Sequence, residues 1–90
     1  MLDIVASNRF KKDLKLAIKR GYNIALLDDV VNQLAMQKTL GEKYKDHELT
    51  GDFRGFRECH ITPDWLLIYQ IIDNELVLFL SRTGTHSDLF

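Results

Sequence analysis

Residues 65–72 have the sequence WLLIYQII, and this stretch decides the fold. A run that is apolar almost throughout is typical of a central strand covered on both faces. Segments 56–61 and 75–81, the latter with the sequence ELVLFLS, have shorter apolar patterns and predict two further strands. Residues 1–6 alternate weakly and predict a short edge strand.

Two amphipathic helices are predicted between the first strand and the other three. Residues 8–20 repeat apolar side chains at helical spacing and end in two cations before Gly21, a common C-terminal pattern. Asn23 can cap a second helix over about 24–38. The order β-α-α-β-β-β predicts an α+β domain, in which a two-helix hairpin packs on a mostly antiparallel sheet.

Length and composition indicate a single domain over residues 1–90, with 46% hydrophobic residues and a net charge of −1. No apolar run approaches the ~20 residues that span a bilayer, and no leader pattern opens the chain, so we expect a cytoplasmic protein without a membrane partner. The single cysteine, Cys59, fits a reducing compartment. A near-neutral net charge argues against a protein that binds nucleic acid by itself.

The charge is unevenly distributed, however. Residues 7–20 hold six cations against one carboxylate, a local charge of +5, and Lys11, Lys12 and Lys15 belong to this basic helix. Such a helix is a candidate RNA-binding face. A solvated face is the plainer interpretation.

Segment 39–56, TLGEKYKDHELTGDFRGF, has no clean period and contains three glycines, which predicts a long loop. A loop of this length in a compact domain is either functional or a wrong assignment. It carries His47, which periodicity cannot place.

Hairpin register predicts that several polar side chains meet at one end of the sheet. If Asp73 and Asn74 form a two-residue turn, Arg82 lies opposite Trp65. A four-residue loop, ITPD, would place His60 opposite Trp65 as well, with Asp64 in that loop.

A polar tail, TGTHSDLF, follows and has little reason to be ordered unless it docks beside this end of the sheet. It brings His86 and the terminal Phe90.

Imidazoles, a carboxylate and an arginine suit metal-free RNA cleavage. Histidine serves as general acid or base near neutral pH, and arginine matches phosphate oxygens. Trp65 or Phe90 could stack on a base. Each of these residues also has a purely structural interpretation. Trp65, for example, opens an apolar strand, which favours packing in the core. A zinc site drawn from Cys59, His60 and the other histidines stays open as an alternative, although no metal-binding spacing is present.

The segments DHELTG (46–51), GFRECHITPDW (55–65) and RTGTHSDLF (82–90) together resemble the YafQ branch of the RelE superfamily, the toxins of bacterial type II toxin–antitoxin pairs. The resemblance is close over residues 43–90. It implies a RelE-like fold and a ribosome-dependent endoribonuclease that cleaves mRNA without a metal or other cofactor.

Matched position by position, the resemblance implies roles for seven residues of this chain. His86 would be the general acid, Arg82 would contact phosphate, and Trp65 and Phe90 would provide aromatic contacts. Proton abstraction and orientation would be shared among the remaining three, His47, His60 and Asp64.

The resemblance also implies a cognate antitoxin as partner, with the 70S ribosome and mRNA, and contact with operator DNA only through the antitoxin. A competing hypothesis from another class is a non-catalytic RelE-fold module that binds the ribosome or a protein through the basic helix.

Overall fold

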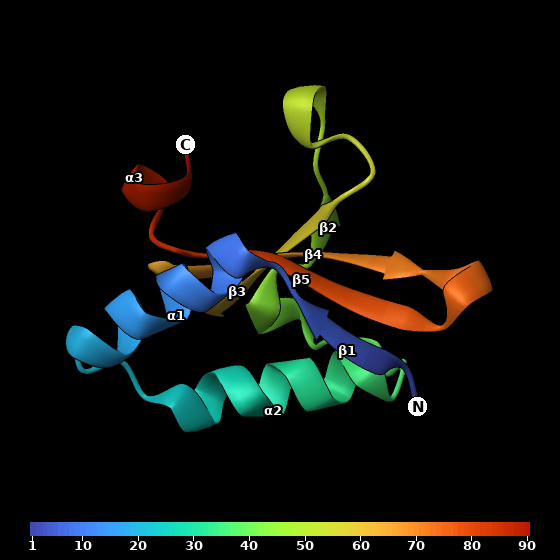
Figure 1. The fold of residues 1–90 in the computed structure, drawn as a ribbon, viewed down its shortest axis with the longest axis horizontal. Coiled ribbons are helices and arrows are strands. Elements are labelled where there is room, and N and C mark those ends of the chain that lie inside the picture. Colours follow the sequence, from blue (N-terminus) through green and yellow to red (C-terminus); the bar gives the residue numbers. More distant parts are fainter.

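The computed structural model describes residues 1–90 as a five-stranded sheet covered by helices, in the strand order β1-β5-β4-β3-β2 (Figure 1). β1 runs parallel to β5, and the other neighbours are antiparallel. The α+β prediction is therefore confirmed. The strands are β1 (Asp3–Ala6), β2 (His47–Glu48), β3 (Arg57–Thr62), β4 (Trp65–Ile72) and β5 (Val77–Gly84), and the helices are α1 (Asn8–Lys19), α2 (Ile24–Ala35) and α3 (His86–Leu89).

The first two helices begin at side-chain caps. The Ser7 hydroxyl accepts a hydrogen bond from the amide of Phe10 at 2.9 Å, and the Asn23 side chain accepts one from Ala25 at 3.1 Å. Between them Gly21 has a φ of +80°, a conformation that suits glycine and lets the chain reverse after α1. The helices run in opposite senses, as predicted, and α2 ends three residues earlier than expected (Figure 1).

The two faces of the sheet have different cover. On one face, α1 and α2 pack on alternate strand residues, among them Cys59, Leu67, Tyr69 and Leu78. On the opposite face, Leu66 and Ile68 of β4 pack against Leu89 of α3, with Phe53 and Phe56 beside them. The near-continuous apolar run of β4 is explained by this two-sided burial.

The predicted long loop over 39–56 is wrong, because it holds β2, which pairs with β3 and completes the sheet. Asp46 anchors this segment: it accepts hydrogen bonds from the Tyr69 hydroxyl at 2.5 Å and from Arg57 at 3.1 Å. A two-residue strand has no apolar periodicity, so the pattern could not reveal it.

The predicted register of the β4–β5 hairpin is also wrong. Ile72 pairs with Val77 rather than Glu75, because the connection is a short 3-10 turn over Asp73–Glu75 followed by Leu76 in the left-handed region. Ser81 then forms a bulge, with Leu80 opposite Tyr69 and Arg82 opposite Ile68.

The bulge changes the face of the sheet on which the later side chains of β5 lie. One extra residue moves all later side chains of a strand to the opposite face. Arg82 therefore shares the face of Ile68, whereas Leu80 lies on the helix-covered face.

The C-terminal tail is ordered. β5 extends to Gly84, and Thr85 caps α3 through a reciprocal pair of hydrogen bonds with Asp88, 3.2 and 2.9 Å long. None of the helices has the length and apolar character needed to cross a membrane.

Candidate active site

A row of side chains crosses four strands on the sheet face that α1 and α2 leave uncovered. His47 of β2 pairs with Glu58 of β3, Glu58 pairs with Ile68, and Ile68 pairs with Arg82. Directly opposed residues of antiparallel strands share a face. His60 lies two residues beyond Glu58 along β3 and so lies on this face too.

Glu58 lies between two imidazoles. One of its carboxylate oxygens lies 3.4 Å from Nε2 of His60 and 4.0 Å from Nε2 of His86. The imidazole rings of the two histidines are 5.9 Å apart, centre to centre. The Glu58 side chain is only 5% exposed, whereas that of His86 is 63% exposed. A buried carboxylate thus faces one sheltered and one accessible imidazole, as expected for a group that orients histidines.

His47 has a defined tautomer in its neutral form. Its Nδ1 lies 2.7 Å from the carbonyl oxygen of Lys45, which can only accept, so Nδ1 carries the proton. Lys45 has a φ of +48°, and this tight turn precedes the strand on which His47 lies. Nε2 of neutral His47 is left with a free lone pair on an exposed side chain, which suits a proton acceptor.

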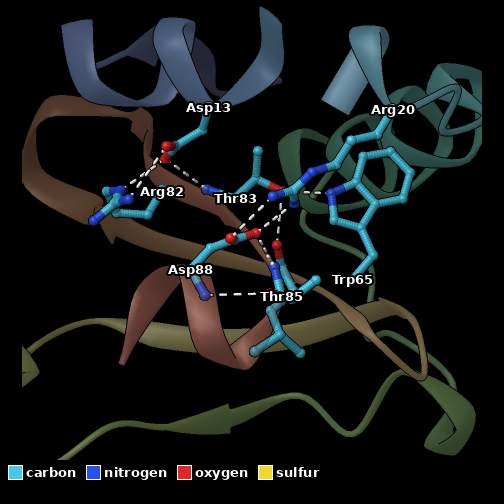
Figure 2. Close-up of polar contacts among 8 residues, drawn as sticks. Asp13, Arg20, Trp65, Arg82, Thr83, Thr85 and Asp88 are labelled. Atoms are coloured by element: carbon cyan, nitrogen blue, oxygen red, sulfur yellow. Dashed lines mark hydrogen bonds and ion pairs between the residues drawn. The ribbon is translucent and has the colours of Figure 1, made fainter. Parts of the chain in front are cut away.

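Arg82 reaches α1 from the same face. Its Nε and Nη2 donate to the two carboxylate oxygens of Asp13 at 2.7 and 3.2 Å (Figure 2). The backbone amide of Thr83 donates to the same carboxylate at 3.2 Å. The position of Arg82 is therefore set by α1 as well as by the sheet.

Phe90 stays accessible at the end of α3. The residue is 59% exposed, and its ring packs edge-on against Phe53, with 5.4 Å between ring centres. The ring of His86 lies 6.0 Å away from it. An exposed aromatic ring beside an exposed imidazole can receive a flat group such as a base.

Trp65 lies outside this cluster. It is 3% exposed within the core, against the Tyr22 ring, and its indole N–H donates to the Thr83 hydroxyl at 2.8 Å (Figure 2). The structure therefore supports the core-packing interpretation of Trp65 and speaks against stacking on a base.

Asp64 is exposed in the two-residue β3–β4 turn and makes no side-chain hydrogen bond or ion pair. The four-residue loop predicted there is wrong, since Thr62 rather than His60 pairs with Trp65. The carboxylate that contacts His60 is Glu58 instead of Asp64.

Lys11, Lys12 and Lys15 are exposed on α1 and take part in no ion pair. The basic helix nevertheless has less free charge than its composition suggests, because Arg20 pairs with Asp88 at 2.6 Å.

Cys59 and His60 point to opposite faces of β3, so the two side chains cannot share one zinc ion as ligands. No group of three His, Cys, Asp or Glu side chains is arranged to hold a metal ion.

Sequence reasoning missed Glu58, Asp13 and Arg20. Strand alternation could have found Glu58, because it lies two residues before His60. No local signal predicts the other two, since their partners lie 69 and 68 residues away.

Comparison with known proteins agrees with this fold. The sequence model of the family described as "Bacterial toxin of type II toxin-antitoxin system, YafQ" matches residues 2–90. The "mRNA interferase toxin YafQ" of Escherichia coli strain K12 is 42% identical over 89 residues, which cover 98% of this chain and 95% of that protein.

Solved structures show the same similarity. A metal-bound toxin from Helicobacter pylori is 52% identical, with full coverage of both chains and a TM-score of 0.95. The E. coli DinJ–YafQ toxin–antitoxin complex contains a chain that is 41% identical, with a TM-score of 0.89 and coverage of 99% of this chain and 97% of that one. This chain belongs to the YafQ family of bacterial type II toxin–antitoxin toxins.

Proposed function

We propose that this chain is an mRNA interferase, an endoribonuclease that cuts mRNA on the 70S ribosome by attack of the substrate's own 2′-hydroxyl. The observation that carries the proposal is the contact of one buried Glu58 oxygen with the imidazoles of His60 and His86, on the sheet face that α1 and α2 leave uncovered. The curated E. coli relative is named an mRNA interferase, which supports the reaction class.

The reaction needs a base, an acid and a cation. Neutral His47 would accept the 2′-hydroxyl proton at Nε2, because its Nδ1–H is engaged by Lys45. His86 would protonate the departing 5′-oxygen, since its side chain is accessible. Glu58 would orient the imidazoles of His60 and His86, and His60 would help to position His86. Asp64 would act only if substrate binding moves the β3–β4 turn toward these imidazoles.

Arg82 and Phe90 would bind the strand. The N–H groups of Arg82 that Asp13 does not use can donate to phosphate oxygens as negative charge develops there. Phe90 would stack on one base, an interaction worth about 1–3 kcal/mol.

Ribosome dependence follows from weak unaided RNA binding. A net charge of −1 leaves few phosphates that the chain could neutralise by itself. The ribosome would hold the mRNA, and the toxin would contribute the reacting groups. Such a toxin would act in the cytoplasm.

A cognate antitoxin would restrain the toxin, as the DinJ–YafQ complex suggests for this family. Contact with operator DNA would then come only through the antitoxin.

The test uses purified chain and ribosomes stalled on a defined mRNA with an empty decoding site. We expect a single cut on the ribosome, little cutting of the same RNA free in solution, and no cut when the nucleotide 5′ to the scissile bond lacks its 2′-hydroxyl. His86→Ala should abolish the cut while the circular dichroism spectrum is unchanged. Efficient cutting of free RNA would contradict ribosome dependence, and cutting of the 2′-deoxy substrate would contradict the nucleophile.

A chelator selective for transition metals, added at constant Mg²⁺ so that the ribosome stays intact, tests the metal. We expect cleavage to persist. Loss of cutting that added Zn²⁺ or Cu²⁺ restores would show instead that this chain uses a metal, and the metal-bound Helicobacter pylori relative makes that outcome worth testing.

The non-catalytic binding module is the second candidate, and the unpaired lysines of α1 are the observation in its favour. It requires ribosome binding without any cut in the same assay.

A further inference from the structure

The helix that carries His86 is too short to be stable alone. α3 has four residues, and isolated helices shorter than ~12 residues are marginal in water. Its one buried side chain is Leu89, which packs on Leu66 and Ile68. Further contacts must hold His86 beside His60.

Arg20 supplies such a contact from the other end of the chain. It follows α1 as the C-cap residue, and its guanidinium crosses to α3 (Figure 2). Nη1 donates to Oδ2 of Asp88 at 2.6 Å, and Nη2 donates to Oδ1 at 3.2 Å. Paired N–H groups on both oxygens fix direction as well as distance.

Asp88 connects this contact to the start of α3. The same Oδ2 accepts the backbone amide of Thr85 at 2.9 Å, so one carboxylate binds Arg20 and caps the helix. The Arg20 guanidinium, with the Thr85 amide, holds the pKa of Asp88 well below its usual range. Asp88 is therefore ionised at all pH values at which the toxin would work.

Gly84 leaves room for this arrangement. A Cβ atom at residue 84 would lie 2.9 Å from Oδ2 of Asp88, closer than real Cβ atoms approach, and 3.0 Å from Cβ of Asp88, which is a tight contact. The φ of Gly84 is also +157°, which L residues rarely adopt. The backbone before α3 is thus shaped to admit the Asp88 carboxylate.

We propose that Arg20 and Asp88 form a latch that positions the catalytic imidazole of His86, and that neither residue touches the RNA. The latch ties the C-cap of α1 to α3, so His86 stays 5.9 Å from His60, ring centre to ring centre, and Phe90 stays against Phe53. This inference rests on the proposed function, because it assigns a purpose to the placement of His86.

The test compares Arg20→Ala with Asp88→Asn, which removes the charge while its amide oxygen can still cap Thr85. Lys38→Ala is the matched control, since it removes one exposed, unpaired cation shortly after α2. Two readouts are needed: ¹⁵N relaxation of residues 86–90, and single-turnover cleavage on ribosomes over a range of toxin concentrations.

We expect both latch variants to increase the fast motion of residues 86–90 and to lower the maximal cleavage rate about 10- to 100-fold, because small misplacements of a reacting group cost that much. The concentration for half-maximal rate should stay the same, and the double variant should be no worse than either single one. Lys38→Ala should match the parent chain.

Opposite effects of the two substitutions would overturn the latch. If Arg20 instead contacted phosphate, Asp88→Asn would free it and strengthen ribosome binding. Unchanged relaxation in Arg20→Ala, or loosened residues 86–90 with an unchanged cleavage rate, would overturn it as well. If the parent chain does not cut mRNA, the proposed function fails, and relaxation still shows whether Arg20 and Asp88 hold α3.

Discussion

Asp13 and Arg82, 69 residues apart, form an ion pair with two hydrogen bonds, in which Nε and Nη2 lie 2.7 and 3.2 Å from the two carboxylate oxygens. Both side chains are largely buried, at 13% and 18% exposed. The hydrogen bond to Asp13 raises the pKa of Arg82, so the guanidinium is charged at every working pH. Asp13 occupies two of the five N–H groups of Arg82, which leaves three for the proposed contact with phosphate. The pair therefore aims Arg82 without blocking it.

We predict that Asp13→Asn lowers the free energy of unfolding by about 2 kcal/mol, since it weakens two charge-assisted hydrogen bonds of a sheltered arginine. Cleavage should fall about tenfold as Arg82 loses its fixed direction. Urea denaturation and the ribosome assay measure the two effects. In a double-mutant cycle with Arg82→Ala, the stability effects should be strongly non-additive. Additive effects would show that the pair contributes little.

The helices and the three long strands could be predicted because their apolar residues recur at helix or strand spacing or, in β4, form a continuous run that is buried on both faces. The candidate residues His60, Arg82 and His86 could be predicted from their positions near strand ends, although the predicted register that grouped them is wrong. Asp13, Arg20 and the bulge at Ser81 could not be predicted, because they depend on contacts across almost the whole chain. For Trp65, the pattern predicts a position at the end of the sheet but not the face on which the side chain lies. That face depends on the strand register, which only tertiary packing sets.

Trp65→Phe should destabilise the fold and spare catalysis. The Thr83 hydroxyl loses the indole N–H donor, which lies 2.8 Å away, and the smaller ring leaves a gap beside Tyr22. We expect a loss of about 1–3 kcal/mol in thermal or urea unfolding. The cleavage rate at 25 °C should change less than about threefold, because the ring is buried. A large loss of activity in a stably folded variant would restore Trp65 to the substrate site.

The thiol of Cys59 should be inert in the folded chain. Burial, together with the nearby carboxylates of Asp46 and Glu58, raises the pKa of Cys59 from 9.0 to about 12. At pH 8.5 we therefore expect iodoacetamide to alkylate the native protein far more slowly than the urea-unfolded protein, because the thiolate is the nucleophile. Mass spectrometry follows the reaction, and equal rates would contradict this burial.

The raised pKa of Cys59 also predicts how the stability of the fold depends on pH. A raised folded-state pKa favours the neutral thiol, so its contribution to stability is complete below pH 9.0 and is lost as the pH rises toward about 12. Burial, with the Asp46 hydrogen bond, raises the pKa of Tyr69 also, so Cys59→Ala should reduce the alkaline loss only in part. Urea unfolding between pH 8 and 11 measures this loss of stability. An unchanged slope in Cys59→Ala would exclude a contribution from the thiol.

Glu58→Gln should lower the cleavage rate while the fold is retained. The substitution keeps the shape of the side chain and removes the negative charge that faces His60 and His86 at 3.4 and 4.0 Å. Without the charged acceptor the two imidazoles are less firmly oriented, so the maximal cleavage rate should fall about tenfold. Asp64→Asn is the matched control, and we expect it to leave the rate unchanged. The reverse result would return the orienting role to Asp64.

Replacing Lys11, Lys12 and Lys15 with glutamine tests whether α1 contacts ribosomal RNA. All three are exposed and unpaired, so the fold should lose little stability. We expect ribosome affinity at low salt to fall about tenfold and its salt dependence to become shallower, because fewer counterions are released on binding. The control is Asn32→Asp with Gln37→Glu and Lys38→Gln, which shifts the net charge equally at α2 and just beyond it. Equal losses in both variants would indicate a general charge effect, and no loss in either would show that the basic helix is only solvated.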